Sequence, residues 1–184
     1  EAHDPSQVIP YAGTVIYRGA GNFARVVTSE LMYRVWEAVV TSYVSDVSFH
    51  HDTNQVLDRD AQLSWPAALW TLPTAALTPA ASVYLDGFKF HILFADQTAS
   101  DRSPTEMMAT HARMEAIAKH CFIRFSDLYI NDSTEFQGVL IDLELVGTPT
   151  FTPEWDQSGT MYTGVAMSCQ VKATQVECVD AYFN

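Results

Sequence analysis

A large apolar side chain at every second position between residues 88 and 94 is the feature that most narrows the possible folds; Lys89, His91 and Leu93 lie between them. Every second position in this stretch is a large apolar residue: Phe88, Phe90, Ile92 and Phe94. Successive side chains of a β-strand point to opposite faces of the sheet, so a period of two predicts a strand with one buried face. The fold must therefore contain a sheet that packs one side against another layer.

Three further segments have strand patterns. Residues 139–145 and 165–171 also alternate, and residues 65–72 form a short apolar run with Pro66 near its start, where a missing N–H matters least. We expect a last short strand over residues 175–179. Irregular connections are expected at residues 74–82 and around Pro149, Pro153 and Gly159.

Two segments have helical spacing. Ser29 is a candidate N-cap, and the apolar residues that follow it recur at i, i+4 steps, which predicts a helix of about four turns. Ser103, Pro104 and Glu106 combine an N-cap, a proline at the first helical position and a glutamate three residues beyond the cap. This arrangement predicts a second helix of about five or six turns that ends before Asn131.

The order of these elements predicts an α+β fold, in which two helices pack on one face of a mainly antiparallel sheet. Residues 1–28 mix proline and glycine with a short strand at residues 14–17, so we interpret them as an extended N-terminal arm. Residues 29–184 are predicted to form a single α+β domain, since the 184-residue chain is too short for two full ones. Polar residues dominate between 44 and 64, which predicts a loop; a turn is expected at residues 96–102.

Composition limits the partners. The formal net charge is -12, with ten Lys and Arg scattered along the chain, so tight nucleic-acid binding is not expected. No stretch reaches the roughly 18 to 20 apolar residues that a membrane helix needs, and we expect a soluble protein without a membrane partner. The chain begins at Glu1 and shows no secretory pattern, which leaves open whether Glu1 is a processed terminus.

The cysteines are predicted to be buried packing residues without a catalytic role. Cys121, Cys169 and Cys178 have no C-x-x-C spacing, and an odd thiol remains under any pairing. Cys121 falls on an apolar helix face and Cys169 on an apolar strand face, whereas reactive thiols need accessible, electropositive surroundings. We interpret all three as free thiols, with no obligatory disulfide.

Histidines supply the remaining candidates for chemistry. His50, His51 and Asp52 could each bind a divalent metal, but adjacent residues do not easily converge on one ion. His111 and Glu115 lie one helical turn apart, with Lys119 and His120 further along, a row that is typical of a solvated helix face. No glycine spacing for phosphate binding occurs. We therefore predict no catalytic, metal-binding or cofactor-binding residue and no cofactor.

One part of the sequence resembles a known family. It comprises the run Trp65-Pro66-Ala67-Ala68-Leu69-Trp70-Thr71-Leu72-Pro73, the segment Gly87-Phe88-Lys89-Phe90-His91-Ile92-Leu93-Phe94-Ala95-Asp96 and the capped helix that follows. In this order they resemble small tail-terminator and head-tail joining (neck ring) proteins of tailed bacteriophages. Residues 152–156 and 162–165 fit the same plan, so the likeness extends over roughly residues 29–172. The N-terminal arm and the long 46–64 loop depart from it.

The resemblance implies a structural virion protein without catalysis. Its partners would be further copies of itself in a ring, expected to be a hexamer with edges paired between neighbours, and the adjacent tail or neck proteins. Genomic DNA would pass through the lumen without specific binding, which suits a net acidic subunit. The protein would be located in the virion, in tail or neck, and in the host cytoplasm during assembly.

Two other functions remain open at this stage. In a binding module or secreted accessory protein, Trp65, Trp70, Trp155 and Tyr162 would line a ligand groove. In a hydrolase, His50, His51 or His111 would converge with an acid in one cleft.

Overall fold

The computed structural model describes residues 15–17, 23–25, 29–51, 64–80, 83–98, 103–137, 139–156 and 162–175. Its helices are α1 (Ser29–Tyr43) and α3 (Pro104–Tyr129). Its strands are β1 (Val15–Tyr17), β2 (Phe23–Arg25), β3 (Ser48–His51), β4 (Ala67–Ala80), β5 (Val83–Gln97), β6 (Thr134–Phe136), β7 (Val139–Ile141), β8 (Leu143–Leu145), β9 (Thr150–Asp156) and β10 (Tyr162–Gln175).

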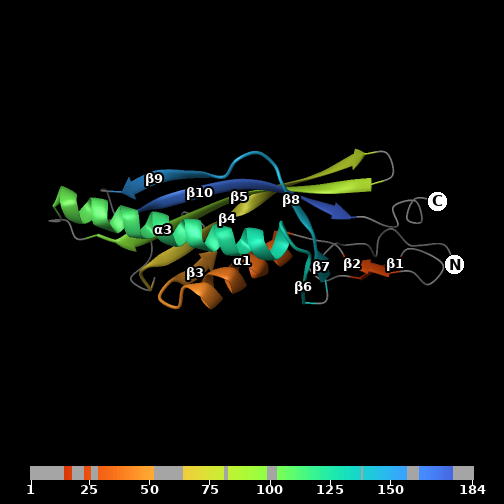
Figure 1. The fold of residues 1–184 in the computed structure, drawn as a ribbon, viewed down its shortest axis with the longest axis horizontal. Coiled ribbons are helices and arrows are strands. Elements are labelled where there is room, and N and C mark those ends of the chain that lie inside the picture. Colours follow the sequence, from red (N-terminus) through yellow and green to blue (C-terminus); the bar gives the residue numbers. More distant parts are fainter. Residues whose placement is uncertain are drawn as a thin grey trace.

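A six-stranded sheet forms the centre of the molecule (Figure 1). Its order is β3-β4-β5-β10-β8, and β9 pairs with β10 beside β8. Only β3 and β4 run parallel; the other pairs in this sheet are antiparallel. The predicted α+β class with a mainly antiparallel sheet is confirmed.

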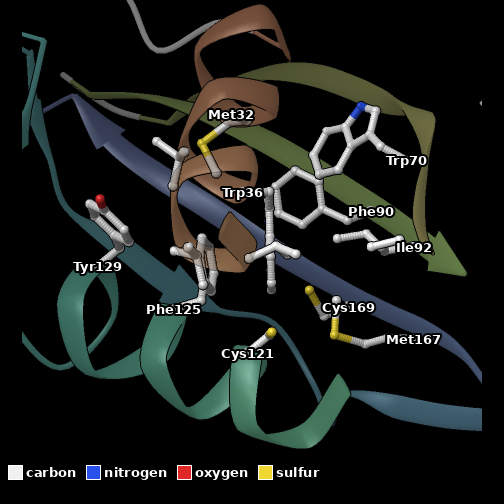
Figure 2. Close-up of a cluster of buried hydrophobic side chains, with 14 of the residues drawn as sticks. Met32, Trp36, Trp70, Phe90, Ile92, Cys121, Phe125, Tyr129, Met167 and Cys169 are labelled. Atoms are coloured by element: carbon white, nitrogen blue, oxygen red, sulfur yellow. The ribbon is translucent and has the colours of Figure 1, made fainter. Parts of the chain in front are cut away.

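Both described helices cover the same face of this sheet, as predicted. Side chains from α1, α3 and alternate positions of β4, β5 and β10 form one buried cluster (Figure 2). We call this face the helix face. The largest of its fully buried side chains include Trp36, Trp70, Phe88, Phe90, Phe94, Phe125 and Ile92.

The opposite face, called the outer face below, is also buried over part of its area. Ala67, Leu69, Leu93 and Ala95 are almost inaccessible to solvent there, and Trp65 and Tyr162 pack against them. The alternation of the sequence indicated one buried face only. The difference arises because Leu93 and Ala95 alternate with the helix-face residues Ile92 and Phe94. All four residues of this part of β5 are therefore apolar and buried.

Helix α3 begins as its sequence predicts. The hydroxyl of Ser103 accepts a hydrogen bond from the N–H of Glu106 at 3.3 Å, and the Glu106 carboxylate accepts one from the N–H of Ser103 at 2.8 Å. This reciprocal pair satisfies two donors that the first turn leaves open. The helix spans 26 residues, about seven turns, and is longer than predicted because no breaker precedes Ile130.

Replacement of Ser103 by alanine tests this cap. We expect the free energy of unfolding to fall by about 1 kcal/mol, because the N–H of Glu106 loses its acceptor. Chemical denaturation measures the change. Thr105→Ala, one step inside the helix and exposed, is the control and should alter stability by less than about 0.5 kcal/mol. Equal effects of the two substitutions would show that the cap contributes nothing.

Three predicted irregular segments contain strands instead. β3 lies in the expected loop, where four residues pair with β4. β4 continues through residues 74–80, with a register shift between Thr71 and Thr74. β9 includes Pro153, at the border of the described sheet. Prolines are tolerated in such strands because, at the edge of a sheet, an N–H that points away from the neighbouring strand makes no ladder hydrogen bond. The expected turn at residues 96–102 also starts later, since β5 runs to Gln97.

Other predictions fall partly outside the described residues. The short strand of the N-terminal arm is confirmed as β1, which pairs with β2. The rest of residues 1–28, Asp52, residues 99–102, Gly159, Cys178 and residues 176–179 lie outside. The described helices include none that is long and apolar enough to cross a membrane.

Candidate functional site

His50 and His51 point to opposite sides of the sheet. The ring of His51 lies 5.7 Å from the ring of Tyr33 in α1, on the helix face. His50 is the neighbouring strand residue and pairs in register with Leu69, on the outer face. The two imidazoles therefore cannot converge on one metal ion. Within the described ranges, no group of three or more His, Cys, Asp or Glu could hold a metal ion.

His111 and Glu115 share a helix face but do not form an acid–base pair. The Nζ of Lys119 donates a hydrogen bond to Glu115 Oε1 at 2.6 Å, and this bond holds the pKa of Glu115 below its usual value. The ring of His120 lies 6.3 Å from that of Tyr43. Since His111 belongs to the helix layer and His50 to the outer face of the sheet, the structure does not bring together the histidines of the hydrolase hypothesis.

Cys121 and Cys169 are free and buried in the helix-face core. Figure 2 shows the first on α3 and the second on β10, with their sulfur atoms in the same part of the core as Met167. Burial raises the pKa of each thiol to about 12. At neutral pH both are protonated, and they contribute packing and not nucleophilic chemistry.

The four aromatic residues of the binding-groove hypothesis lie in three different environments. Trp70 is fully buried on the helix face, with its ring 5.1 Å from that of Phe90. Trp65 and Tyr162 pack on the outer face. Trp155 is 60% exposed on β9. These side chains do not line a common groove.

Sequence reasoning missed one polar pair on the outer face. The Nδ1 of His91 lies 2.9 Å from the Oγ of Ser168, within hydrogen-bonding distance, because β5 and β10 place the two residues opposite each other. No motif marks the pair, since 77 positions separate its members. Only the strand register, which the sequence does not specify, could have revealed it.

An exposed apolar surface is the clearest candidate for function. Helix α3 carries a solvent-facing strip of small and apolar side chains: Met108, Ala109, Ala112, Ala116 and Ile123. We call it the α3 strip. Met108 is 73% exposed and Ile123 is 56% exposed. Because Met108 and Ile123 are large and exposed, we take the α3 strip as a candidate surface for contact with another protein.

Trp155 of β9 is a further exposed apolar side chain near α3. Phe151 of the same strand packs edge-on against Phe122 of α3, with ring centroids 6.4 Å apart. Trp155 pairs in register with Thr163 and so lies on the same helix face as Phe151, beside α3. The α3 strip and Trp155 together contain three of the four exposed large apolar residues among those described.

The charge of α3 also suits contact between copies. Within Pro104–Tyr129, three basic residues balance three acidic ones, whereas the whole chain carries a formal net charge of -12. Two of the basic residues are already paired: Arg113 with Asp96 at 3.4 Å and Lys119 with Glu115. Copies of an acidic protein approach each other with the least repulsion through a neutral face.

Comparisons with known proteins do not show a family. No protein-family model matches the chain, and no curated protein matches it. Among solved structures, the chain is similar to one described as "Virion of native gene transfer agent (GTA) particle", with a TM-score of 0.45 and 11% identity. The match covers 79% of this chain and 93% of that chain. A likeness this weak carries no functional argument.

Proposed function

We propose that the protein is a non-catalytic structural subunit of a virion, and that copies of it form a ring at the tail end or neck of a tailed bacteriophage. The α3 strip and Trp155 carry this proposal. Met108 and Ile123 lie at the two ends of an exposed helix face. Contact with another protein would remove their apolar surface from water. The order of sequence elements, which resembles tail-terminator and head-tail joining proteins, supports the phage assignment.

The sheet edges help to define the contact. Edge strand β9 contains Pro153, and β4 contains Pro73 and Pro79 beyond its pairing with β3. A proline on an edge interrupts any ladder that a neighbouring strand could add. We therefore infer that copies associate mainly through side-chain packing, with a smaller part for the paired edges that the resemblance implies.

The proposed partners follow from the ring. They are further copies of the chain, most simply as a hexamer, and the adjacent tail or neck proteins. DNA passes through the lumen without specific binding, because an acidic subunit repels phosphate. The protein then resides in the virion and, during assembly, in the host cytoplasm.

Ile123→Asp tests the surface. We expect the variant to remain folded, because Ile123 is exposed, but to assemble at least about tenfold more weakly, since a buried unpaired carboxylate costs more than 1.4 kcal/mol. Native mass spectrometry and sedimentation velocity measure the assemblies, and circular dichroism checks the fold. Ser42→Asp is the control: it places the same charge at an exposed position of α1, outside the strip.

Two results would contradict the proposal. If Ile123→Asp assembles as strongly as the wild type, the α3 strip is not part of the contact. Normal particles from a phage that lacks the protein would rule out the tail or neck role.

A further inference from the structure

Arg124 differs from the other two basic residues of α3. Arg113 is paired with Asp96 and Lys119 with Glu115, but no carboxylate among the described residues forms an ion pair with Arg124. Asp127, less than one turn further along α3, instead accepts a hydrogen bond from the side-chain amide of Asn131 at 3.5 Å. The Arg124 side chain is exposed, so its positive charge is available to a partner.

Tyr43 holds the guanidinium of Arg124 in place. The Cζ of Arg124 lies over the ring of Tyr43, the last residue of α1, at 5.1 Å from the ring centroid. In such a cation–π contact the flat face of the guanidinium meets the ring, and the N–H groups point outwards in the guanidinium plane. Donors in that plane match the two oxygens of a carboxylate. We call Arg124 and Tyr43 together the Arg124 site.

The Arg124 site adjoins the α3 strip. Ile123, the residue before Arg124, belongs to the strip, and Tyr43 is itself 41% exposed. Helices α1 and α3 lie side by side on the helix face (Figure 1), joined by the stacked rings of Trp36 and Phe125. The site therefore has a fixed base. Tyrosine and arginine are also among the residue types that contribute most binding energy in protein interfaces.

Contact at the α3 strip creates a need for an acid. A partner that covers Ile123 also approaches Arg124, because consecutive residues of a helix are about 1.5 Å apart along its axis. Removing an unpaired charge from water is costly, whereas a carboxylate that accepts its hydrogen bonds offsets the cost. The surface that covers the strip is therefore expected to bring a carboxylate to Arg124.

We propose that the Arg124 site binds a carboxylate side chain of a second copy of this protein. The inference rests on the self-association proposed above and adds a charged contact beside the α3 strip. A second copy suits the site, because the chain has 22 Asp and Glu against ten Lys and Arg. A pair of opposite charges also steers and orients the approach of the copies. DNA is a poorer partner, since a formal net charge of -12 repels phosphate.

Arg124→Ala tests the contact. We expect the variant to stay folded, because the side chain is exposed, and to self-associate at least about tenfold more weakly than the wild type, because a carboxylate in the contact loses its partner. Arg124→Lys keeps the charge but loses the planar donors, so its association should be intermediate. Sedimentation velocity measures association, and circular dichroism checks the fold. Added salt should weaken the wild type more than Arg124→Ala.

Arg34→Ala is the matched control. Arg34 is also exposed and lies over a tyrosine ring, 5.6 Å from the centroid of Tyr33, but its guanidinium is already paired with Glu37 at 2.9 Å. The substitution makes the same change in net charge and should leave association within about threefold of the wild type. Ser42→Asp, the control above, keeps the Arg124 site intact, because Ser42 lies about 100° from Tyr43 around α1.

The remaining outcomes are decisive. Association of Arg124→Ala at wild-type strength, or an equal loss in Arg34→Ala, would overturn the inference. If the wild type binds a short DNA duplex and Arg124→Ala does not, the site takes phosphate and the inference also fails. If Ile123→Asp disrupts assembly while Arg124→Ala assembles normally, only the Arg124 contact fails and the proposed ring subunit stands. A wild type that stays monomeric at every concentration removes both.

Discussion

Replacing Trp36 with alanine is expected to lower the free energy of unfolding by about 3 to 5 kcal/mol. Trp36 is fully buried and stacks on Phe125 with ring centroids 4.3 Å apart and an interplanar angle of 15°. It also packs edge-on against Phe90, with ring centroids 6.3 Å apart. One side chain therefore joins α1, α3 and the sheet. Its indole N–H has no acceptor among the described residues, and the loss is therefore one of packing. Urea denaturation measures it.

Trp155→Ala provides the matched control. The same substitution on a side chain that is 60% exposed should change the free energy of unfolding by less than about 0.5 kcal/mol. It should instead weaken assembly, because Trp155 belongs to the exposed apolar surface that we propose contacts other copies. A loss below about 1 kcal/mol for Trp36→Ala would show that the two helices do not share one core with the sheet.

Raising the pH from about 8 to about 10.5 is expected to destabilise the protein by about 2 kcal/mol for each buried thiol. Burial raises the pKa of Cys121 and Cys169 from 9.0 to about 12. Above pH 9 the thiols of the unfolded chain lose their protons while those of the folded protein keep them. The stabilisation is therefore complete below that pH and is lost as the pH rises towards 12.

The double variant Cys121→Ala, Cys169→Ala separates this effect from other alkaline titrations. Burial also raises the pKa of Tyr33 and Tyr129, which adds a pH dependence common to both proteins. The variant should be less stable than the wild type at neutral pH, because it leaves cavities, yet its stability should fall less steeply with pH. Identical slopes would mean that the two thiols are accessible to solvent in the folded protein.

The function proposed for this protein depends on its surfaces and not on its histidines. The histidines singled out in the sequence lie on different faces of the sheet or have other partners, as His51 does with Tyr33 and His120 with Tyr43. The α3 strip instead presents two large apolar side chains, Met108 and Ile123, to solvent. The strip has no sequence motif, because its residues only become neighbours when the segment forms a helix.

Local patterns in the sequence determined the helices and the main strands. The Ser103–Glu106 capping box specified the start of α3, and the alternation of Phe88 to Phe94 specified β5, because hydrogen bonds within one turn and burial of one strand face act between near neighbours. The apolar stripes also predicted correctly that both helices lie on one face of the sheet.

Tertiary structure decided the rest, because the contacts concerned join residues far apart in the chain. Pairing with β4 and β10 made strands of residues that propensity assigns to loops, as in β3 and in β9 around Pro153. Strand alternation separated His50 from His51, and the β5–β10 register brought His91 to Ser168. A proline or a polar residue is unfavourable in an isolated strand, but ladder hydrogen bonds and burial offset that preference once a partner strand is in place.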